Sequence, residues 1–166
     1  ARLTGSGGRR SRSARNPGTV PIESQTADSD VLDATIRRIA PNLVQQDDDV
    51  WASPSLAEVS YPEEAHDLCF DIEAGSFWFR HRNDVILRAM RRFPPAGPVF
   101  DIGGGNGFVS AALRDAGFGT VLVEPGASGA RNAARRGLRP IVRASVDDAG
   151  FVPSSLPAAG LFDVVE

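Results

Sequence analysis

The sequence predicts an α/β fold in which helices cover both faces of a parallel sheet. From residue 97 onward, short apolar runs alternate with segments of helical pattern about ten residues long. Two of those segments end at a glycine, a common residue just after a helix. No internal repeat points to another architecture. Apolar strands separated by helices are typical of βαβ units, whose strands are buried on both faces.

The chain before residue 76 divides into two predicted regions. Residues 1–27 are rich in Gly, Ser, Arg and Pro, and they carry too little apolar surface to offset the entropy of ordering. We therefore predict a disordered tail there. Residues 28–75 form an acidic cap region, which we predict to be partly helical. Its first part, residues 28–40, predicts a short helix ended by Pro41, because four apolar residues share one face: Val31, Leu32, Ile36 and Ile39. The remainder predicts only short pieces of structure.

Residues 76–166 carry the regular pattern of the predicted sheet. Residues 76–93 predict an amphipathic helix, whose apolar face consists of Phe79, Ile86, Met90 and Phe93. Strands are predicted within 97–104, 120–125, 139–145 and 161–165, with helices at 107–117 and 127–137. The sequence ends as the fourth strand begins. We therefore expect a sheet that is incomplete at its C-terminal side, and 166 residues that alone are marginally stable and weakly active.

Composition excludes several kinds of site within this sequence. All 18 basic residues are arginine, whereas a phosphate-binding P-loop needs a lysine. Cys69 is the only cysteine, which excludes an intrachain disulfide and a multi-cysteine metal site. No His, Cys, Asp or Glu spacing fits a metal ligand set. No apolar run is long enough to cross a membrane, and no apolar segment typical of a secretory signal follows the N-terminal arginines. We expect a cytoplasmic protein without a membrane partner.

The net charge of −3 is unevenly distributed along the chain. Residues 1–16 hold five arginines and no acid, whereas residues 23–73 hold thirteen acids and two arginines. A basic footprint typical of nucleic-acid-binding proteins is absent. We therefore expect a small-molecule partner and no nucleic acid.

The main candidate site is the segment DIGGGNG, residues 101–107, which ends the first of these predicted strands. Ligands of open parallel sheets bind at the carboxyl ends of the strands, and glycines let the backbone approach a ligand closely. The spacing here is G-x-G-x-G. The dinucleotide fingerprint G-x-G-x-x-G would need a glycine where Phe108 or Ser110 stands. Asp101 would repel a pyrophosphate but suits an ammonium group, so the charge favours S-adenosylmethionine over NAD.

A second candidate is Glu124, which ends the next predicted strand. An acid about 20 residues past the first glycine of such a loop is placed to accept hydrogen bonds from the hydroxyls of a ribose. The alternative interpretation is an acid that caps the following helix. Together with the Asp101 loop, the ribose role is the favoured hypothesis.

The ordered set DIGGGNG, VLVEP, RASVDD and LFDVV, preceded by SFWFRHRNDVIL, resembles the Rossmann-like class I family of S-adenosylmethionine-dependent methyltransferases over residues 76–166. The resemblance implies a methyltransferase with S-adenosylmethionine as its cofactor. It implies that the glycine loop, with Asp101, Gly103, Gly105 and Gly107, binds the methionine part and that Glu124 binds the ribose.

The same resemblance implies weaker assignments elsewhere. Ser145 and Val146 would lie at the edge of the adenine, with Asp147 as a neighbouring candidate, although many members of the family carry an aspartate where Ser145 stands. Arg82 matches an arginine of the helix before the glycine loop and would pair with the cofactor carboxylate. A solvated helix arginine is its equal alternative.

Several other conspicuous residues are interpreted as structural. Methyl transfer is an in-line attack that depends on positioning, and it needs a general base only when the acceptor loses a proton. We therefore assign no catalytic residue and expect neither His81 nor His66 to act as a base. The aromatic residues at 77–79 favour packing over a pocket wall, and Cys69 favours a role as a small hydrophobe.

Two other functions stay open at this level. A nicotinamide-dependent oxidoreductase would use a similar fold, but Asp101 and the missing third glycine disfavour it. A non-catalytic, methyltransferase-like scaffold is the second alternative, and it has no need of Asp101 or Glu124.

Overall fold

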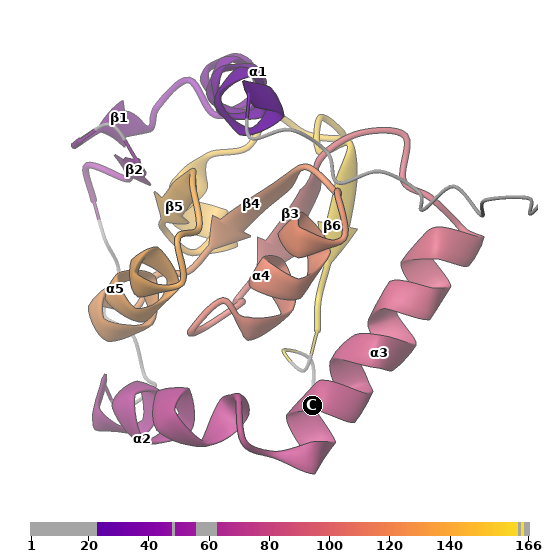
Figure 1. Ribbon diagram of the computed structural model, residues 1–166. Coiled ribbons are helices and arrows are strands. Elements are labelled where there is room, and N and C mark those ends of the chain that lie inside the picture. Colours follow the sequence, from indigo (N-terminus) through magenta and orange to yellow (C-terminus); the bar gives the residue numbers. More distant parts are fainter. Residues whose placement is uncertain (1–22, 48, 56–62, 163, 165–166) are drawn as a thin grey trace, which may run out of the picture.

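The computed structural model describes residues 23–47, 49–55, 63–162 and 164, so most of the predicted tail lies outside the described residues (Figure 1). Six strands form one sheet: β1 (Val44–Gln45), β2 (Val50–Ala52), β3 (Val99–Ile102), β4 (Thr120–Val123), β5 (Ile141–Arg143) and β6 (Ala158–Gly160). Their order is β1-β2-β5-β4-β3-β6. The β1–β2 pair is antiparallel and the other neighbours are parallel. The predicted α/β class is therefore confirmed.

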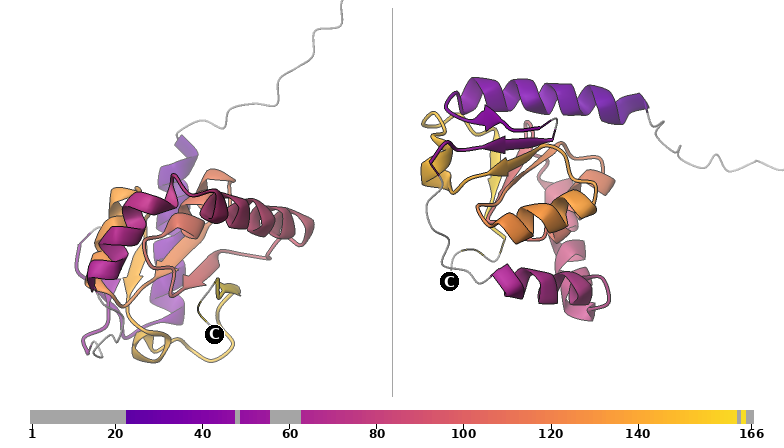
Figure 2. Two further views of the ribbon diagram at one scale, coloured as in Figure 1. Left: turned by 90° about the horizontal axis from the view of Figure 1, so that it is seen from below. Right: turned by 90° about the vertical axis from the view of Figure 1, so that its left-hand side faces the viewer.

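Six helices accompany the sheet: α1 (Glu23–Ile39), α2 (Glu63–Glu73), α3 (Phe77–Arg92), α4 (Phe108–Asp115), α5 (Ala127–Arg135) and α6 (Val146–Ala149). Helix α1 lies on one side of the sheet and α5 on the other, as Figure 2 shows. Helix α3, with Ser76 before it and Phe93 after it, matches the predicted helix at 76–93. The helices predicted at 107–117 and 127–137 correspond to α4 and α5.

The two faces of the sheet build different parts of the core. In β3, Phe100 and Ile102 pack in the cluster that contains Ile36 and Ile39 of α1. Val99, which precedes Phe100, packs with Val109 and Leu113 of α4 on the opposite face. Successive side chains of a strand point to opposite faces, so Asp101 lies on the same face as Val99, towards α4. The alternation therefore decides on which side of the sheet the candidate site opens.

The N-terminal region differs from its prediction in two respects. Helix α1 begins at Glu23, so residues 23–27, predicted as disordered, are helical. No glycine or proline interrupts 23–39, and the buried Ile36 and Ile39 anchor the helix to the sheet. Strands β1 and β2 extend the sheet, with Val50, Trp51 and Ala52 paired to β5. Strands of two and three residues are too short for a periodic pattern, because their stability comes from a partner distant in sequence.

The fourth strand was predicted at 161–165, where residues 163 and 165 lie outside the described residues and residues 161, 162 and 164 are not in a strand. The strand next to β3 is β6, and its pairing register aligns Ala158 with Val99 and Gly160 with Asp101. Phe162 instead leaves the strand and packs with Val99 and Leu113. The residues that pair with the β3 backbone are thus the small residues of Ala158–Gly160. The apolar segment from residue 161, which was predicted as a strand, contributes the Phe162 side chain to the core.

Candidate functional site

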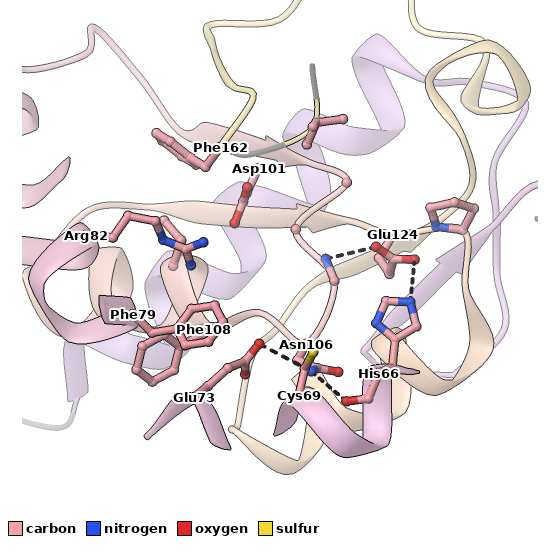
Figure 3. A pocket seen from close by; sticks show the side chains of 16 residues that line it. His66, Cys69, Glu73, Phe79, Arg82, Asp101, Asn106, Phe108, Glu124 and Phe162 are labelled. Carbon is pink, nitrogen blue, oxygen red and sulfur yellow. Dashed lines mark hydrogen bonds and ion pairs between the residues drawn. The ribbon is translucent and has the colours of Figure 1, made fainter. Parts of the chain in front are cut away.

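The candidate site lies at the point where the strand order reverses. Along the chain, β3, β4 and β5 are added in one direction, and β6 then returns to the other side of β3. Ligands of open α/β sheets bind beyond the carboxyl ends of the strands at such a point. A cavity of about 440 Å³ opens there, lined by the glycine loop, by α2 and α3, by the end of β4 and by the segment after β6 (Figure 3). This volume lies within the range usual for small-molecule sites.

Asp101 is the most deeply buried charge of the cavity, with no exposed surface. Its Oδ2 accepts a hydrogen bond of 2.6 Å from the Ser110 hydroxyl on α4. Its Oδ1 is buried and has no hydrogen-bond partner among the described residues. Loss of hydration raises the pKa of this carboxyl from 3.8 to about 6, although the Ser110 bond and the charge of Arg82 oppose the shift. A buried acceptor without a partner is costly, which makes this oxygen a candidate ligand contact.

Glu124 is held by the two loops that flank it. Its Oε2 accepts a 2.8 Å hydrogen bond from the Gly105 amide, and its Oε1 accepts a 2.7 Å bond from the Gly126 amide. A carboxylate has about four acceptor positions, so two amides fix its orientation without saturating it. Glu124 and Asp101 both line the cavity, and their roles in binding a cofactor stay predictions.

The glycines of the loop have different roles. Gly103 and Gly105 line the cavity with φ of +66° and +54°, a region that favours glycine. Gly107 does not line the cavity. Its φ is +71°, and a Cβ there would collide with the side chains of Leu138 and Ala133. Close packing against the segment around α5 therefore accounts for Gly107 without a ligand.

Arg82 reaches the cavity from α3, where its guanidinium lies 5.1 Å from the centre of the Phe79 ring. Its positive charge opposes the rise in the pKa of Asp101 that burial causes. The structure places Arg82 in the lining of the cavity, and its pairing with a cofactor carboxylate stays a prediction. Asn83, the next residue, attaches α3 to the start of α4 through a 3.0 Å hydrogen bond to the Phe108 carbonyl.

Helix α2 contributes three residues that sequence reasoning did not assign to the site. His66, Cys69 and Glu73 line the cavity together. Their separations of three and seven positions place them on one face of a helix, and this spacing was the available signal. The segment was not predicted as a firm helix, so the signal was not used.

A buried polar network holds α2 against the glycine loop. The Asn106 side-chain amide donates to the His66 carbonyl at 2.8 Å and to Glu73 Oε1 at 3.3 Å. Arg136 of the α5 end donates to Glu73 Oε2 at 2.6 Å and to the Asn106 carbonyl at 3.0 Å. Both carboxylate oxygens of Glu73 thus accept hydrogen bonds, one from the Asn106 amide and one from the Arg136 guanidinium, which disfavours a role as a general base. Its burial nevertheless raises its pKa.

The predicted adenine residues lie outside this cavity. Ser145 precedes α6 and caps it, accepting a 3.1 Å hydrogen bond from the Asp148 amide and donating a 2.7 Å bond to the Asp148 carboxylate. Val146 and Asp147 are exposed on the same short helix. The cavity therefore brings together Asp101, Gly103, Gly105 and Glu124, whereas Gly107, Ser145 and Val146 are not part of its lining.

The remaining conspicuous residues of α3, His81 and the aromatic residues at 77–79, differ in whether they line the cavity. His81 is exposed, and its ring stacks on that of Phe77 with 5.6 Å between centroids. Trp78 is also exposed, whereas Phe79 lines the cavity and meets Phe108 edge to face. The prediction that the aromatic residues at 77–79 pack, and do not wall a pocket, is therefore wrong: Phe77 and Trp78 are exposed, and Phe79 lines the cavity.

Among the residues described, no group of three or more His, Cys, Asp or Glu side chains could hold a metal ion. No helix in the described ranges is long and apolar enough to cross a bilayer. Models of known protein families and the sequences of curated proteins give no match to this chain.

Proposed function

We propose that the chain binds S-adenosylmethionine in this cavity and transfers its methyl group to an acceptor, for which a small molecule is the default. The observation that carries the proposal is the Asp101 Oδ1 atom, a buried carboxylate oxygen without a partner among the described residues. It lies at the reversal of strand order, where ligands of this fold class bind. An ammonium group would satisfy this oxygen and offset the cost of its burial.

The charge of the cavity supports a cationic ligand. Among the described residues, its lining includes three carboxylates, those of Glu73, Asp101 and Glu124, and a single arginine, Arg82. S-adenosylmethionine carries an ammonium and a sulfonium, and its one carboxylate would pair with Arg82. The ribose hydroxyls would bind Glu124, whose orientation is already set by two amides.

When bound, the cofactor supplies an activated methyl group, so the chain has to position both reactants and exclude water. Phe79 and Phe108 provide apolar walls for that purpose. No general base is required for an acceptor that reacts through a lone pair, and we assign none.

The nicotinamide alternative is disfavoured by contacts as well as by spacing. Ser110 stands where a dinucleotide fingerprint begun at Gly105 would have its third glycine, and its hydroxyl is bonded to Asp101. A pyrophosphate would therefore meet a buried carboxylate instead of free amides. A non-catalytic scaffold would have no use for that buried charge.

The first test is calorimetric titration of S-adenosylhomocysteine, the product form of the cofactor, with NAD as the comparison ligand. We expect saturable binding of S-adenosylhomocysteine and none of NAD. Asp101→Ala and Glu124→Ala should each weaken binding by at least tenfold, because each removes a charge-assisted contact. Asp115→Ala, at an exposed acid paired with Arg114, serves as the control and should bind normally. Binding of NAD without competition from S-adenosylhomocysteine would support the oxidoreductase, and a folded protein that binds neither would support the scaffold.

A further inference from the structure

A second residue faces the ribose position beside Glu124. The His66 imidazole lies next to the Glu124 carboxylate, with 4.0 Å between Nε2 and Oε1 (Figure 3). His66 is buried, and the 2.8 Å hydrogen bond from Asn106 to its carbonyl fixes its place on α2. The ring lies over three glycines, since a Cβ built on Gly105, Gly126 or Gly129 would fall 3.1–3.6 Å from its nearest atom.

The separation of the two polar atoms suits a bridging hydroxyl. A distance of 4.0 Å is too long for a direct hydrogen bond. A hydroxyl oxygen at about 2.8 Å from both atoms would span it at roughly a right angle. A hydroxyl group donates one hydrogen bond and accepts others, so it can donate to the carboxylate and accept from an imidazole N–H.

Gly126 supports the view that this space is kept open. Its φ is −69°, an ordinary value that any residue adopts, so its backbone does not require glycine. A Cβ at this position would lie 2.8 Å from Glu124 Oε1 and 3.3 Å from His66 Nε2. A side chain there would crowd the gap between the two atoms. The absence of a side chain therefore has a steric explanation in the site.

We propose that His66 and Glu124 together bind one hydroxyl of the cofactor ribose, and that His66 makes the site selective for ribose over a deoxyribose. The proposal rests on the proposed function for the identity of the ligand. The two amides on Glu124 hold the acceptor, and α2 carries the donor. His66 acts in binding and specificity, and it takes no part in proton transfer to the acceptor.

The test is a thermodynamic cycle in which substitutions of the His66 side chain are combined with ligands that lack one ribose hydroxyl. Wild type, His66→Ala and His66→Gln are titrated with S-adenosylhomocysteine, adenosine, 2′-deoxyadenosine and 3′-deoxyadenosine. We expect wild type to bind adenosine more tightly than at least one deoxynucleoside. His66→Ala should weaken binding of the two ribose ligands roughly five- to tenfold. It should leave unchanged the affinity for the deoxynucleoside that lacks the hydroxyl between His66 and Glu124. His66→Gln keeps a donor at a similar reach and should retain most of the selectivity.

Two further variants separate this role from packing. His81→Ala removes the exposed histidine of α3, which lies outside the cavity, and should change no affinity. Gly126→Ala should fold normally yet lower the affinity for both ribose ligands, S-adenosylhomocysteine and adenosine. This variant keeps the proposal testable if His66→Ala does not fold. An equal loss for all four ligands in His66→Ala would assign His66 to packing and overturn the proposal.

The ligand set also separates this proposal from the methyltransferase proposal. Adenosine binding with the expected selectivity, but no binding of S-adenosylhomocysteine, would keep the His66 role and overturn the methyltransferase. Binding of S-adenosylhomocysteine without any coupling to His66 would do the reverse. A folded protein that binds none of the four ligands would overturn both.

Discussion

Asp101 combines a structural cost with a proposed binding role. Burial raises its pKa to about 6, compared with 3.8 for an exposed aspartate. At pH values between these two, the folded protein holds a proton that the unfolded chain has lost. The contribution of Asp101 to the free energy of unfolding is therefore fully present below about pH 4, and it is lost as the pH rises through 6. The ionised form destabilises the free protein by about 2–3 kcal/mol at neutral pH, on the order expected for a shift of this size.

Replacing the Asp101 carboxylate should stabilise the free protein and weaken binding of the proposed ligand. Asp101→Asn keeps an acceptor for Ser110 but cannot ionise, so we expect its thermal midpoint at pH 7.5 to exceed that of wild type by about 5 °C. Differential scanning calorimetry at pH 5 and 7.5 checks this, because the gain should shrink at pH 5. The exposed Asp115→Asn is the control. A midpoint equal to or below wild type at pH 7.5 contradicts the assignment of a buried ionised group.

The protonation of Asp101 also predicts how the affinity for the proposed ligand depends on pH. A cationic ligand group favours the ionised form of Asp101, so its affinity should fall as the pH drops below about 6. We expect the dissociation constant of S-adenosylhomocysteine to rise up to roughly tenfold per pH unit in that range. Calorimetric titration between pH 5 and 7.5 measures it, and Asp101→Asn should lose the dependence. An affinity that stays constant across this range would place the ligand away from Asp101.

At the scale of elements, α2 is joined to the rest of the molecule mainly by polar contacts. The Glu73–Arg136 pair is 2.6 Å long, and its side chains are only 9% and 14% exposed. The guanidinium of Arg136 also lies 4.3 Å from the centre of the Phe70 ring and 5.0 Å from that of Phe108. Two apolar residues of α2, Leu68 and Ile72, face solvent. The network around Asn106 therefore decides where this helix lies.

Breaking this ion pair should release α2 while leaving the sheet intact. Glu73→Ala leaves Arg136 buried without its charged partner, at a cost of about 2–4 kcal/mol. Hydrogen–deuterium exchange followed by mass spectrometry should show faster exchange over 63–73 and unchanged protection in β3 and β4. The matched control is Asp115→Ala, which breaks an exposed pair and should cost less than about 1 kcal/mol. Uniform loss of protection would mean that α2 and the sheet unfold together.

At the scale of the whole molecule, the N-terminal region and the sheet share one core. Leu32, Ile36 and Ile39 of α1 pack in the same cluster as Phe100 and Val121 of the central strands. Trp51 of β2 belongs to this cluster too, and its indole N–H donates to Asp33 at 2.7 Å. The predicted cap region is thus part of the domain, although it was expected to precede it.

One core predicts one cooperative transition. Ile36→Ala removes a side chain with no exposed surface and should cost about 2–4 kcal/mol. The neighbouring Val31→Ala, at a residue that is 61% exposed, should cost less than about 0.5 kcal/mol. Urea unfolding followed by circular dichroism and by tryptophan fluorescence measures both, and the two signals should coincide. A fluorescence change at lower urea than the change in circular dichroism would show that the N-terminal region unfolds separately.

The sequence by itself determined the features that local backbone chemistry encodes. Alternating strands and helices predicted the α/β class, because burial on both faces demands continuous apolar runs. The glycines after β3 and the acid after β4 predicted the site, since a parallel sheet brings the carboxyl ends of neighbouring strands to one edge. Asp101 and Glu124 needed no knowledge of distant contacts, and both reach the cavity.

Tertiary structure decided what depends on partners far apart in the chain. Strands β2 and β6 are three residues long, and only pairing with β5 and β3 selects them. His66 enters the site because Asn106 and Arg136, distant in sequence, hold α2 over the glycine loop. The spacing of His66, Cys69 and Glu73 indicates one face of a helix, but it does not indicate which segment that face meets, because the free energy of such contacts is gained only when separate segments come together. For that reason the loop and its acids could be predicted from the sequence, and the residue that faces them could not.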